Sequence, residues 1–165
     1  MTTAICPGSF DPITLGHVDI ICRAAEIFDE VVVCVMHNAA KKSPMFTLEE
    51  KLSMARRAVE GYKNVRVDSY DTCDGLLAEY AKRFEHPVVV KGLRAASDFD
   101  YEFQMNMINK CLNPAVETMF LTASERYTFL SSSIVREVAQ YGAELKGLVP
   151  DAIIPDIEEK AKQWR

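Results

Sequence analysis

Several loops of this sequence carry residues that favour anion binding, and the first of them is PGSFDPITLGH at residues 7–17. It contains neither GxxxxGK[ST] nor GxGxxG, the two common phosphate-binding patterns. Gly8 nonetheless permits a tight backbone path, and Gly16 permits close approach of a ligand to the helix that we expect next. Free amides at a helix start attract anions, and His17 lies where its ring can donate a hydrogen bond to a phosphate. Turn chemistry, with His17 as a core residue, is the alternative interpretation.

Three further loops carry cations or hydroxyl groups. Two lysines stand at residues 41–42, KGLR occupies residues 91–94, and three serines at residues 131–133 precede Arg136 by about one helical turn. Each loop alone has an ordinary explanation, namely solvated lysines, a surface charge pair or a helix cap. One serine is enough for a cap, however, and the four loops together predict a polyphosphate-binding site.

The loops alternate with a regular pattern of secondary structure. Apolar runs predict strands at residues 3–6, 31–36, 65–67, 88–90 and 118–121, and amphipathic stretches predict helices at 15–28, 47–59, 75–84, 99–112, 131–141 and 150–164. Residues 31–36 are apolar on both faces, which is typical of a covered parallel sheet. Thr47 and Glu50 have the spacing of a capping box at a helix start.

This alternation predicts an α/β fold, a doubly wound five-stranded parallel sheet of Rossmann-like type, in a single domain over residues 1–165. Ligands of such sheets bind beyond the carboxyl ends of the strands, at the point where the strand order reverses. We therefore expect the four loops to meet there.

Composition excludes some other classes. The net charge of −5 argues mildly against a nucleic-acid binder. The apolar run at 31–36 is far shorter than the ~20 residues that cross a bilayer, and the N-terminus lacks a signal-peptide pattern, so we expect no membrane association and a cytoplasmic location. Five cysteines without a CxxC pair and three histidines without zinc spacing predict free thiols, with Cys6 and Cys34 buried, and no metal held by protein side chains.

The motifs, taken in this order, resemble the HxGH-type nucleotidyltransferases. TLGH at residues 14–17 matches the [TH]xGH motif, and LSSSIVR at 130–136 matches the second signature, a Ser/Thr-rich helix start followed by a basic residue. Over nearly the whole chain, the sequence resembles the phosphopantetheine adenylyltransferase family. The segments that carry this resemblance are PGSFDPIT at 7–14, KK at 41–42 followed by PMFTLEE at 44–50, GLRA at 92–95 and FLSSS at 129–133. Position 91 is Lys where many of these relatives carry Arg. The positive charge is kept, but the ammonium group lacks the planar, bidentate hydrogen-bonding geometry of a guanidinium group.

The resemblance implies transfer of the adenylyl group of ATP to 4'-phosphopantetheine in coenzyme A biosynthesis, with Mg²⁺ as cofactor and a homohexamer as the assembly. It implies that His17 binds the triphosphate and stabilises the transition state. The residues that it implies in ATP binding are Ser9, Phe10, His17, Gly92, Leu93, Arg94, Glu102, Tyr127, Thr128, Phe129, Leu130, Ser131, Ser132 and Ser133. Those implied in phosphopantetheine binding are Ser9, Lys41 (with Lys42 as the alternative), Leu77 and Lys91.

Two other functions remain open at this point. A sister enzyme of the same fold, such as a nicotinate mononucleotide adenylyltransferase or a cytidylyltransferase, would share the phosphate-binding loops. A non-catalytic nucleotide sensor would also bind the triphosphate, although it would have no need of His17.

The sequence offers no obvious Ser-His-Asp or Cys-His set, and adenylyl transfer to a phosphate needs none, because the attacking oxygen is already an anion.

Overall fold

The structure, a computed structural model, describes residues 1–37, 44–71, 76–94 and 96–164. Its elements are β1 (Thr2–Gly8), α1 (Leu15–Ile27), β2 (Glu30–His37), α2 (Leu48–Val59), β3 (Val65–Asp71), α3 (Leu77–Ala81), β4 (His86–Leu93), α4 (Ala96–Leu112), β5 (Glu117–Thr122), η2 (Glu125–Tyr127), α5 (Ser132–Gln140), η3 (Asp151–Ile153) and α6 (Ile154–Gln163). The predicted alternation of strands and helices is confirmed.

All five strands are longer than their apolar cores predicted, and β4 and β3 differ most. β4 continues through Lys91 and Gly92 to Leu93, because these residues pair with Phe120, Leu121 and Thr122 of β5. β3 continues to Asp71 alongside the end of β2. Lys91 and Gly92 therefore belong to the last residues of a strand and not to the loop that we predicted. A polar side chain does not end a strand when a neighbouring strand still supplies hydrogen-bond partners.

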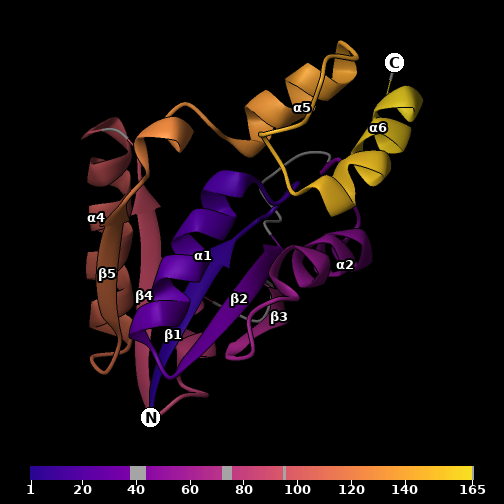
Figure 1. Ribbon diagram of the computed structural model, residues 1–165. Helices are drawn as coiled ribbons and strands as arrows, with labels where there is room; N and C mark the ends of the chain where they lie inside the picture. Colours follow the sequence, from indigo (N-terminus) through magenta and orange to yellow (C-terminus); the bar gives the residue numbers. More distant parts are fainter. Residues whose placement is uncertain (38–43, 72–75, 95, 165) are drawn as a thin grey trace.

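All five strands are parallel and lie in the order β3-β2-β1-β4-β5. The chain moves outwards from β1 to β3 on one side and then returns to add β4 and β5 on the other (Figure 1). The strand order thus reverses between β1 and β4, which confirms the predicted doubly wound fold and fixes where a ligand is expected.

Two apolar clusters cover the two faces of the sheet. Side chains of β2 alternate between them: Val31, Val33 and Val35 join the cluster that packs under α1 and α2, whereas Val32 and Cys34 join the cluster under α3. All five side chains are fully buried and Met36 is half-buried, so the prediction of a strand covered on both faces is confirmed for residues 31–35. None of the helices in the described ranges is both long and apolar enough to cross a bilayer.

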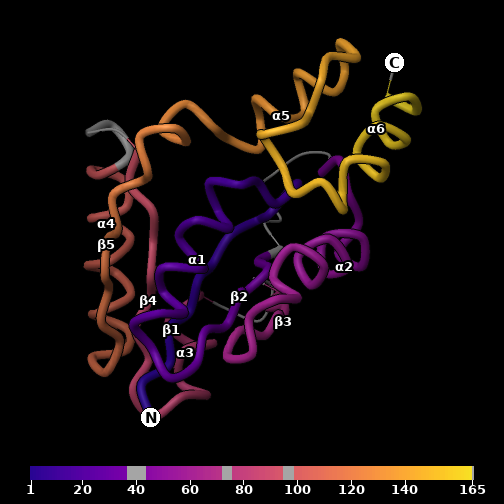
Figure 2. The backbone as a smooth tube through the Cα atoms, in the orientation of Figure 1, coloured from indigo at the N-terminus to yellow at the C-terminus, as the bar shows by residue number. Residues whose placement is uncertain are grey.

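The helix starts bring distant segments to one edge of the sheet. Thr14, Thr47 and Ser131 each cap a helix with a side-chain oxygen, for α1, α2 and α5 respectively. α5 and α6 lie beyond the carboxyl ends of the strands, far from the N-terminus (Figures 1 and 2). α6 is fixed to α2 by a bidentate ion pair between Arg57 and Asp156, with N–O distances of 3.0 and 2.8 Å.

Candidate active site

A cavity of about 340 Å³ opens at the carboxyl edge of the sheet. Residues from the ends of β1 and β4, from the loops that follow β1, β4 and β5, and from the starts of α1 and α5 line it, so it lies where the strand order reverses. The residues predicted for the site that line this cavity are Ser9, Phe10, His17, Lys91, Gly92, Arg94, Glu102, Tyr127, Leu130, Ser131, Ser132 and Ser133. The loops after β1, β4 and β5 therefore converge as the sequence predicted.

Some of the predicted residues do not line the cavity. Leu93 and Thr128 make local contacts: the Leu93 carbonyl accepts the Ala123 amide at 2.8 Å, and Thr128 Oγ1 donates to the Glu125 carbonyl at 2.9 Å. Phe129 is exposed to solvent. For all three, contact with ATP stays a prediction.

The predicted acceptor-binding residues are divided between several places. Lys91 lines the cavity, whereas Leu77 is buried in the cluster under α3, with Ile5 and Tyr80, on the other face of the sheet. The prediction that Lys41 or Lys42 contacts the acceptor falls on residues outside the described ranges.

His17 is held by the first turn of α1. The Thr14 amide donates to His17 Nδ1 at 3.0 Å, and the His17 amide donates to Thr14 Oγ1 at 3.3 Å. This is a capping box in which an imidazole takes the place of the usual Glu or Gln. Because Nδ1 accepts from the backbone, the proton of the neutral ring lies on Nε2. The helix cap thus fixes both the ring and its tautomer, and leaves Nε2 as the donor.

Phe10 packs against the imidazole of His17. Its φ of 42° lies in the left-handed region, where a bulky side chain is rare and costs about 1–3 kcal/mol. The buried Phe10 ring meets the His17 ring edge to face, with the centroids 5.1 Å apart. A Cβ on Gly8 would lie only 2.9 Å from the Phe10 ring, so this position accepts no side chain without a shift of that ring.

Among the residues that the structure describes, three cations and one carboxylate line the cavity. Lys91 forms an ion pair with Glu102 of α4. The guanidinium of Arg94 donates to the Leu130 carbonyl at 3.0 Å, and that of Arg136 donates to the Asp11 carbonyl. The cationic side chains that line the described part of the cavity outnumber the lining carboxylate, although Arg136 also forms an ion pair with Asp11 behind the cavity lining. This balance of charge favours a polyanionic ligand.

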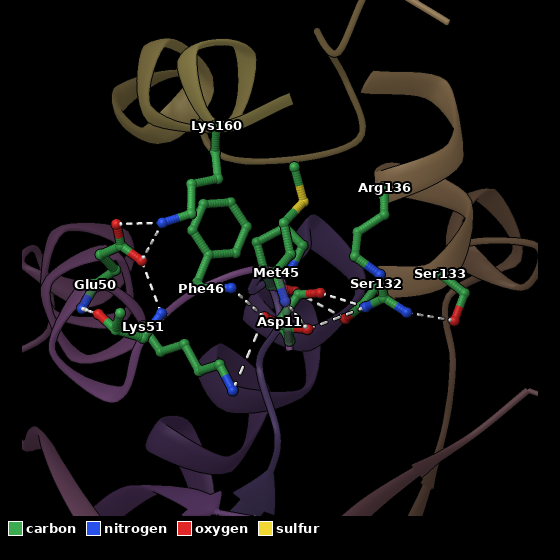
Figure 3. Close-up of polar contacts among 11 residues, drawn as sticks. Asp11, Met45, Phe46, Glu50, Lys51, Ser132, Ser133, Arg136 and Lys160 are labelled. Atoms are coloured by element: carbon green, nitrogen blue, oxygen red, sulfur yellow. Dashed lines mark hydrogen bonds and ion pairs between the residues drawn. The ribbon is translucent and has the colours of Figure 1, made fainter. Parts of the chain in front are cut away.

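The three serines at the start of α5 have three different contacts. Ser131 Oγ caps the helix by accepting the Ile134 amide at 3.2 Å. Ser132 Oγ donates to the Pro12 carbonyl at 2.8 Å, and Arg136 donates to Ser133 Oγ at 3.2 Å (Figure 3). One serine is indeed enough for the cap, and the other two tie the helix start to the β1–α1 loop and to Arg136. The first amides of α5, which have no partner within the helix, add a further site for an anion.

Cysteine chemistry does not contribute to this site. Cys6 lines the cavity, but burial raises the pKa of its thiol to about 12, so it is not a thiolate at neutral pH. Cys6 and Cys34 are both buried, as predicted. In the described part of the chain, no group of three or more His, Cys, Asp or Glu side chains is placed to hold a metal ion.

Two site residues escaped the sequence prediction. The sequence places Asp11 in the first loop, where turn chemistry is the alternative interpretation, and assigns it no contact. In the structure it is buried and contacts both Lys51 and Arg136. Arg136 was noticed as one turn beyond the serines but was not assigned to the site that it lines. No local pattern could have joined Asp11 to Arg136, because they are 125 positions apart in the sequence.

Comparison with known proteins agrees with this geometry. The cytidylyltransferase-like family pattern matches residues 5–138. Curated phosphopantetheine adenylyltransferases are similar over their whole length: that of Caldanaerobacter subterraneus is 48% identical over 163 residues, which cover 99% of each chain. Those of Dictyoglomus turgidum and Streptomyces coelicolor are each 49% identical over 162 residues, which cover 98% of this chain and 99% of the relative.

A solved structure supports the fold alone. The crystal structure of a putative nicotinate-nucleotide adenylyltransferase from Vibrio parahaemolyticus superimposes with a TM-score of 0.69 at 15% identity, covering 99% of this chain and 93% of the other. The family pattern and the full-length identities decide the membership: this chain belongs to the phosphopantetheine adenylyltransferase family, within the cytidylyltransferase-like nucleotidyltransferases.

Proposed function

We propose that the protein transfers the adenylyl group of ATP to 4'-phosphopantetheine, giving dephospho-coenzyme A and pyrophosphate. The relatives that match it over nearly their full length bear the name of this activity. The observation that carries the proposal is that His17, Arg94, Arg136 and the start of α5 line one cavity, at the edge of the sheet where the strand order reverses. We also propose the cytoplasmic location that the sequence predicts.

The reaction needs positioning and charge neutralisation more than proton transfer. A phosphate oxygen of the acceptor attacks the α-phosphorus of ATP, the bond from that phosphorus to the bridging oxygen breaks, and pyrophosphate leaves with the electron pair. The attacking oxygen is already ionised, so no general base is required. Holding the two anions in line can contribute about 7–11 kcal/mol. Donors that meet the charge developing at the α-phosphate supply the rest.

We assign the donor role at the α-phosphate to His17. Its Nδ1 is taken by the Thr14 amide, so Nε2–H is the group that can reach a phosphate oxygen. Arg94 and Arg136 line the same cavity and donate to main-chain carbonyls, and we assign to them the binding of the outgoing phosphates. The charge that forms in the transition state thus meets groups that are already in place.

We propose that Mg²⁺ enters the site with ATP. Glu102, the carboxylate that lines the cavity, is paired with Lys91, so the donor set in the described part of the site suits a cation held by phosphate oxygens and water. Mg²⁺ commonly binds nucleotides in this way. When bound, it would neutralise negative charge on the triphosphate.

Pyrophosphate release tests the function and separates it from its rivals. We expect release in the presence of Mg²⁺ and ATP with 4'-phosphopantetheine, and little with nicotinate mononucleotide. Replacement of ATP by CTP should abolish it. Release with nicotinate mononucleotide alone would assign the protein to the sister enzyme. Tight ATP binding without release, whatever the acceptor, would identify a nucleotide sensor.

The acceptor phosphate should depend on Lys41. We expect Lys41→Ala to raise the phosphopantetheine KM about tenfold or more, because a hydrogen bond between charged groups contributes roughly 1.5–3 kcal/mol. The KM for ATP should change little. Lys42→Ala is the matched control, and a raised KM in that variant with an unchanged value for Lys41→Ala would transfer the role to Lys42. Steady-state kinetics with each substrate varied in turn makes the measurement.

We also propose that the protein is a homohexamer, the assembly that the family resemblance implies. The apolar residues predicted on the fourth helix do not enter the core of the single chain: Phe99, Phe103, Met107, Ile108 and Leu112 of α4 are 42 to 51% exposed. Such a patch on one helix favours burial against another copy. α4 lies at one side of the molecule, where a neighbour can reach it (Figure 1).

A charge within this apolar face should disrupt the assembly. We expect Phe103→Glu to convert the hexamer to smaller species in sedimentation velocity, because a buried unpaired carboxylate is strongly unfavourable in an interface. Tyr141→Glu, a similar change at an exposed aromatic residue that follows α5, should leave the sedimentation coefficient unchanged. A wild-type protein that sediments as a monomer would contradict the proposal.

A further inference from the structure

The carboxyl group of Asp11 joins three segments of the chain although it does not line the cavity. Asp11 lies in the β1–α1 loop and is only 3% exposed. Its two oxygens accept the amides of Met45 and Phe46, at 3.1 and 3.0 Å (Figure 3). The loop after β1 is thereby fixed to the segment that leads into α2.

Two cations flank the same carboxyl group. Lys51 Nζ lies 3.8 Å from Oδ1, and the Lys51 side chain is as buried as its partner. Arg136 Nη1 lies 3.5 Å from Oδ2 and also donates to the main-chain carbonyl of Asp11. Lys51 does not line the cavity, whereas Arg136 does.

Arg136 is held at two points. Its Nη1 contacts both the carboxyl group and the main-chain carbonyl of Asp11, and its Nη2 donates to Ser133 Oγ at 3.2 Å. An unrestrained arginine has many rotamers and loses this freedom when it binds a phosphate. A guanidinium that is already fixed avoids part of that loss, and its geometry is retained between turnovers.

We propose that Asp11 is a positioning residue for adenylyl transfer, which acts by holding Arg136 in place for the phosphates of ATP. The proposal rests on the proposed function. A direct chemical role for Asp11 is not compatible with its surroundings, because its oxygens face two amides and two cations of the protein instead of the cavity. Its effect on the reaction must therefore pass through another side chain. Among the described residues its cationic partners are Lys51 and Arg136, and of these two Arg136 lines the cavity.

A double-mutant cycle of Asp11→Asn and Arg136→Met tests this coupling. Each single variant should lower kcat/KM for MgATP about tenfold or more, because each removes or misplaces a charged contact to the phosphates. The double variant should be no worse than Arg136→Met alone, because Asp11 then has no side chain left to position. Losses that multiply in the double variant would overturn the proposal, and so would an Asp11→Asn variant with unchanged kcat/KM.

Lys51→Met separates positioning from stability. It removes a partner of the same carboxyl group at a place that does not line the cavity. We expect it to lower the Tm while kcat/KM for MgATP stays within about twofold of wild type. A loss of kcat/KM as large as that of Asp11→Asn would mean that any disturbance of the buried cluster has the same effect, and would overturn the proposal.

Arg136→Lys tests the two-point hold even if Asp11→Asn does not fold. A single ammonium group keeps the charge but cannot reproduce the planar fork between Asp11 and Ser133. We expect most of the loss seen with Arg136→Met, and a variant with wild-type kcat/KM would overturn the proposal.

Calorimetric titration of the same variants with ATP, without acceptor, keeps the two proposals distinguishable. A wild-type protein that binds ATP but does not adenylylate phosphopantetheine would contradict the proposed function. If the changes in ATP-binding free energy of the two single variants do not add up in the double variant, the positioning role would still be supported, whereas additive changes would overturn it.

Discussion

Replacement of His17 by Ala should lower kcat about a hundred- to a thousandfold, while the Kd for ATP rises only a few fold. The reason is that we assign ground-state binding of the triphosphate to several groups, of which the imidazole is one, whereas we assign to the imidazole the donor role at the α-phosphate as charge develops there. An interaction that is stronger in the transition state than in the ground state affects turnover more than binding. Single-turnover kinetics and calorimetric titration measure the two effects separately.

The His17 variant also alters the cap of α1. Ala cannot accept the Thr14 amide, so the unfolding free energy should fall by about 1 kcal/mol. This is too little to unfold the protein, and a thermal scan checks it. His86→Ala is the matched control, because His86 is exposed at the amino end of β4, away from the cavity, and its loss should leave kcat unchanged. Near-normal turnover of the His17→Ala enzyme would contradict the donor role that we assign to His17.

Gly8→Ala should damage both stability and turnover through Phe10. The new Cβ would lie 2.9 Å from the Phe10 ring, which is buried and cannot swing into solvent. Overpacking of this kind costs about 1–3 kcal/mol of unfolding free energy. Because the same ring meets the imidazole of His17, a shift of Phe10 moves the catalytic group, and a misplacement of about 1 Å can lower the rate on the order of a hundredfold.

Gly61→Ala is the control for this substitution. A Cβ at Gly61 meets no atom within 4 Å, so the unfolding free energy should stay the same or rise by about 0.4–1 kcal/mol. Its turnover should equal that of wild type. Urea denaturation and steady-state kinetics on the pair make the comparison, and equal turnover in both variants would show that Phe10 does not control the position of His17.

Both predictions reflect a site whose groups are fixed before the ligand arrives. His17 is held by a helix cap, Arg94 by the Leu130 carbonyl, and Arg136 by Asp11 and Ser133. Fixed donors need no reorganisation as charge moves in the reaction, which is the condition for large electrostatic catalysis. The contacts that hold His17 and Arg94 come from the main chain, whereas Arg136 also contacts the side chains of Asp11 and Ser133.

The sequence by itself determined the features that depend on neighbouring residues. The apolar run at 31–36 predicts a strand that is buried on both faces, and its alternate side chains do enter the two clusters. The capping box of Thr47 and Glu50 predicts the start of α2, which the structure confirms. The alternation of strands and helices predicts a doubly wound parallel sheet whose loops after the strands meet at one edge, and the loops after β1, β4 and β5 do line one cavity.

Only the tertiary structure decided the features that depend on distant partners. Lys91 and Gly92 lie in a strand because β5 pairs with them, and the apolar residues of α4 stay exposed because the core of the single chain is filled without them. Asp11 holds amides 34 and 35 positions away and an arginine 125 positions away. A local pattern carries no record of such pairs, because a buried charge needs partners that are near in space, and those can come from any part of the chain.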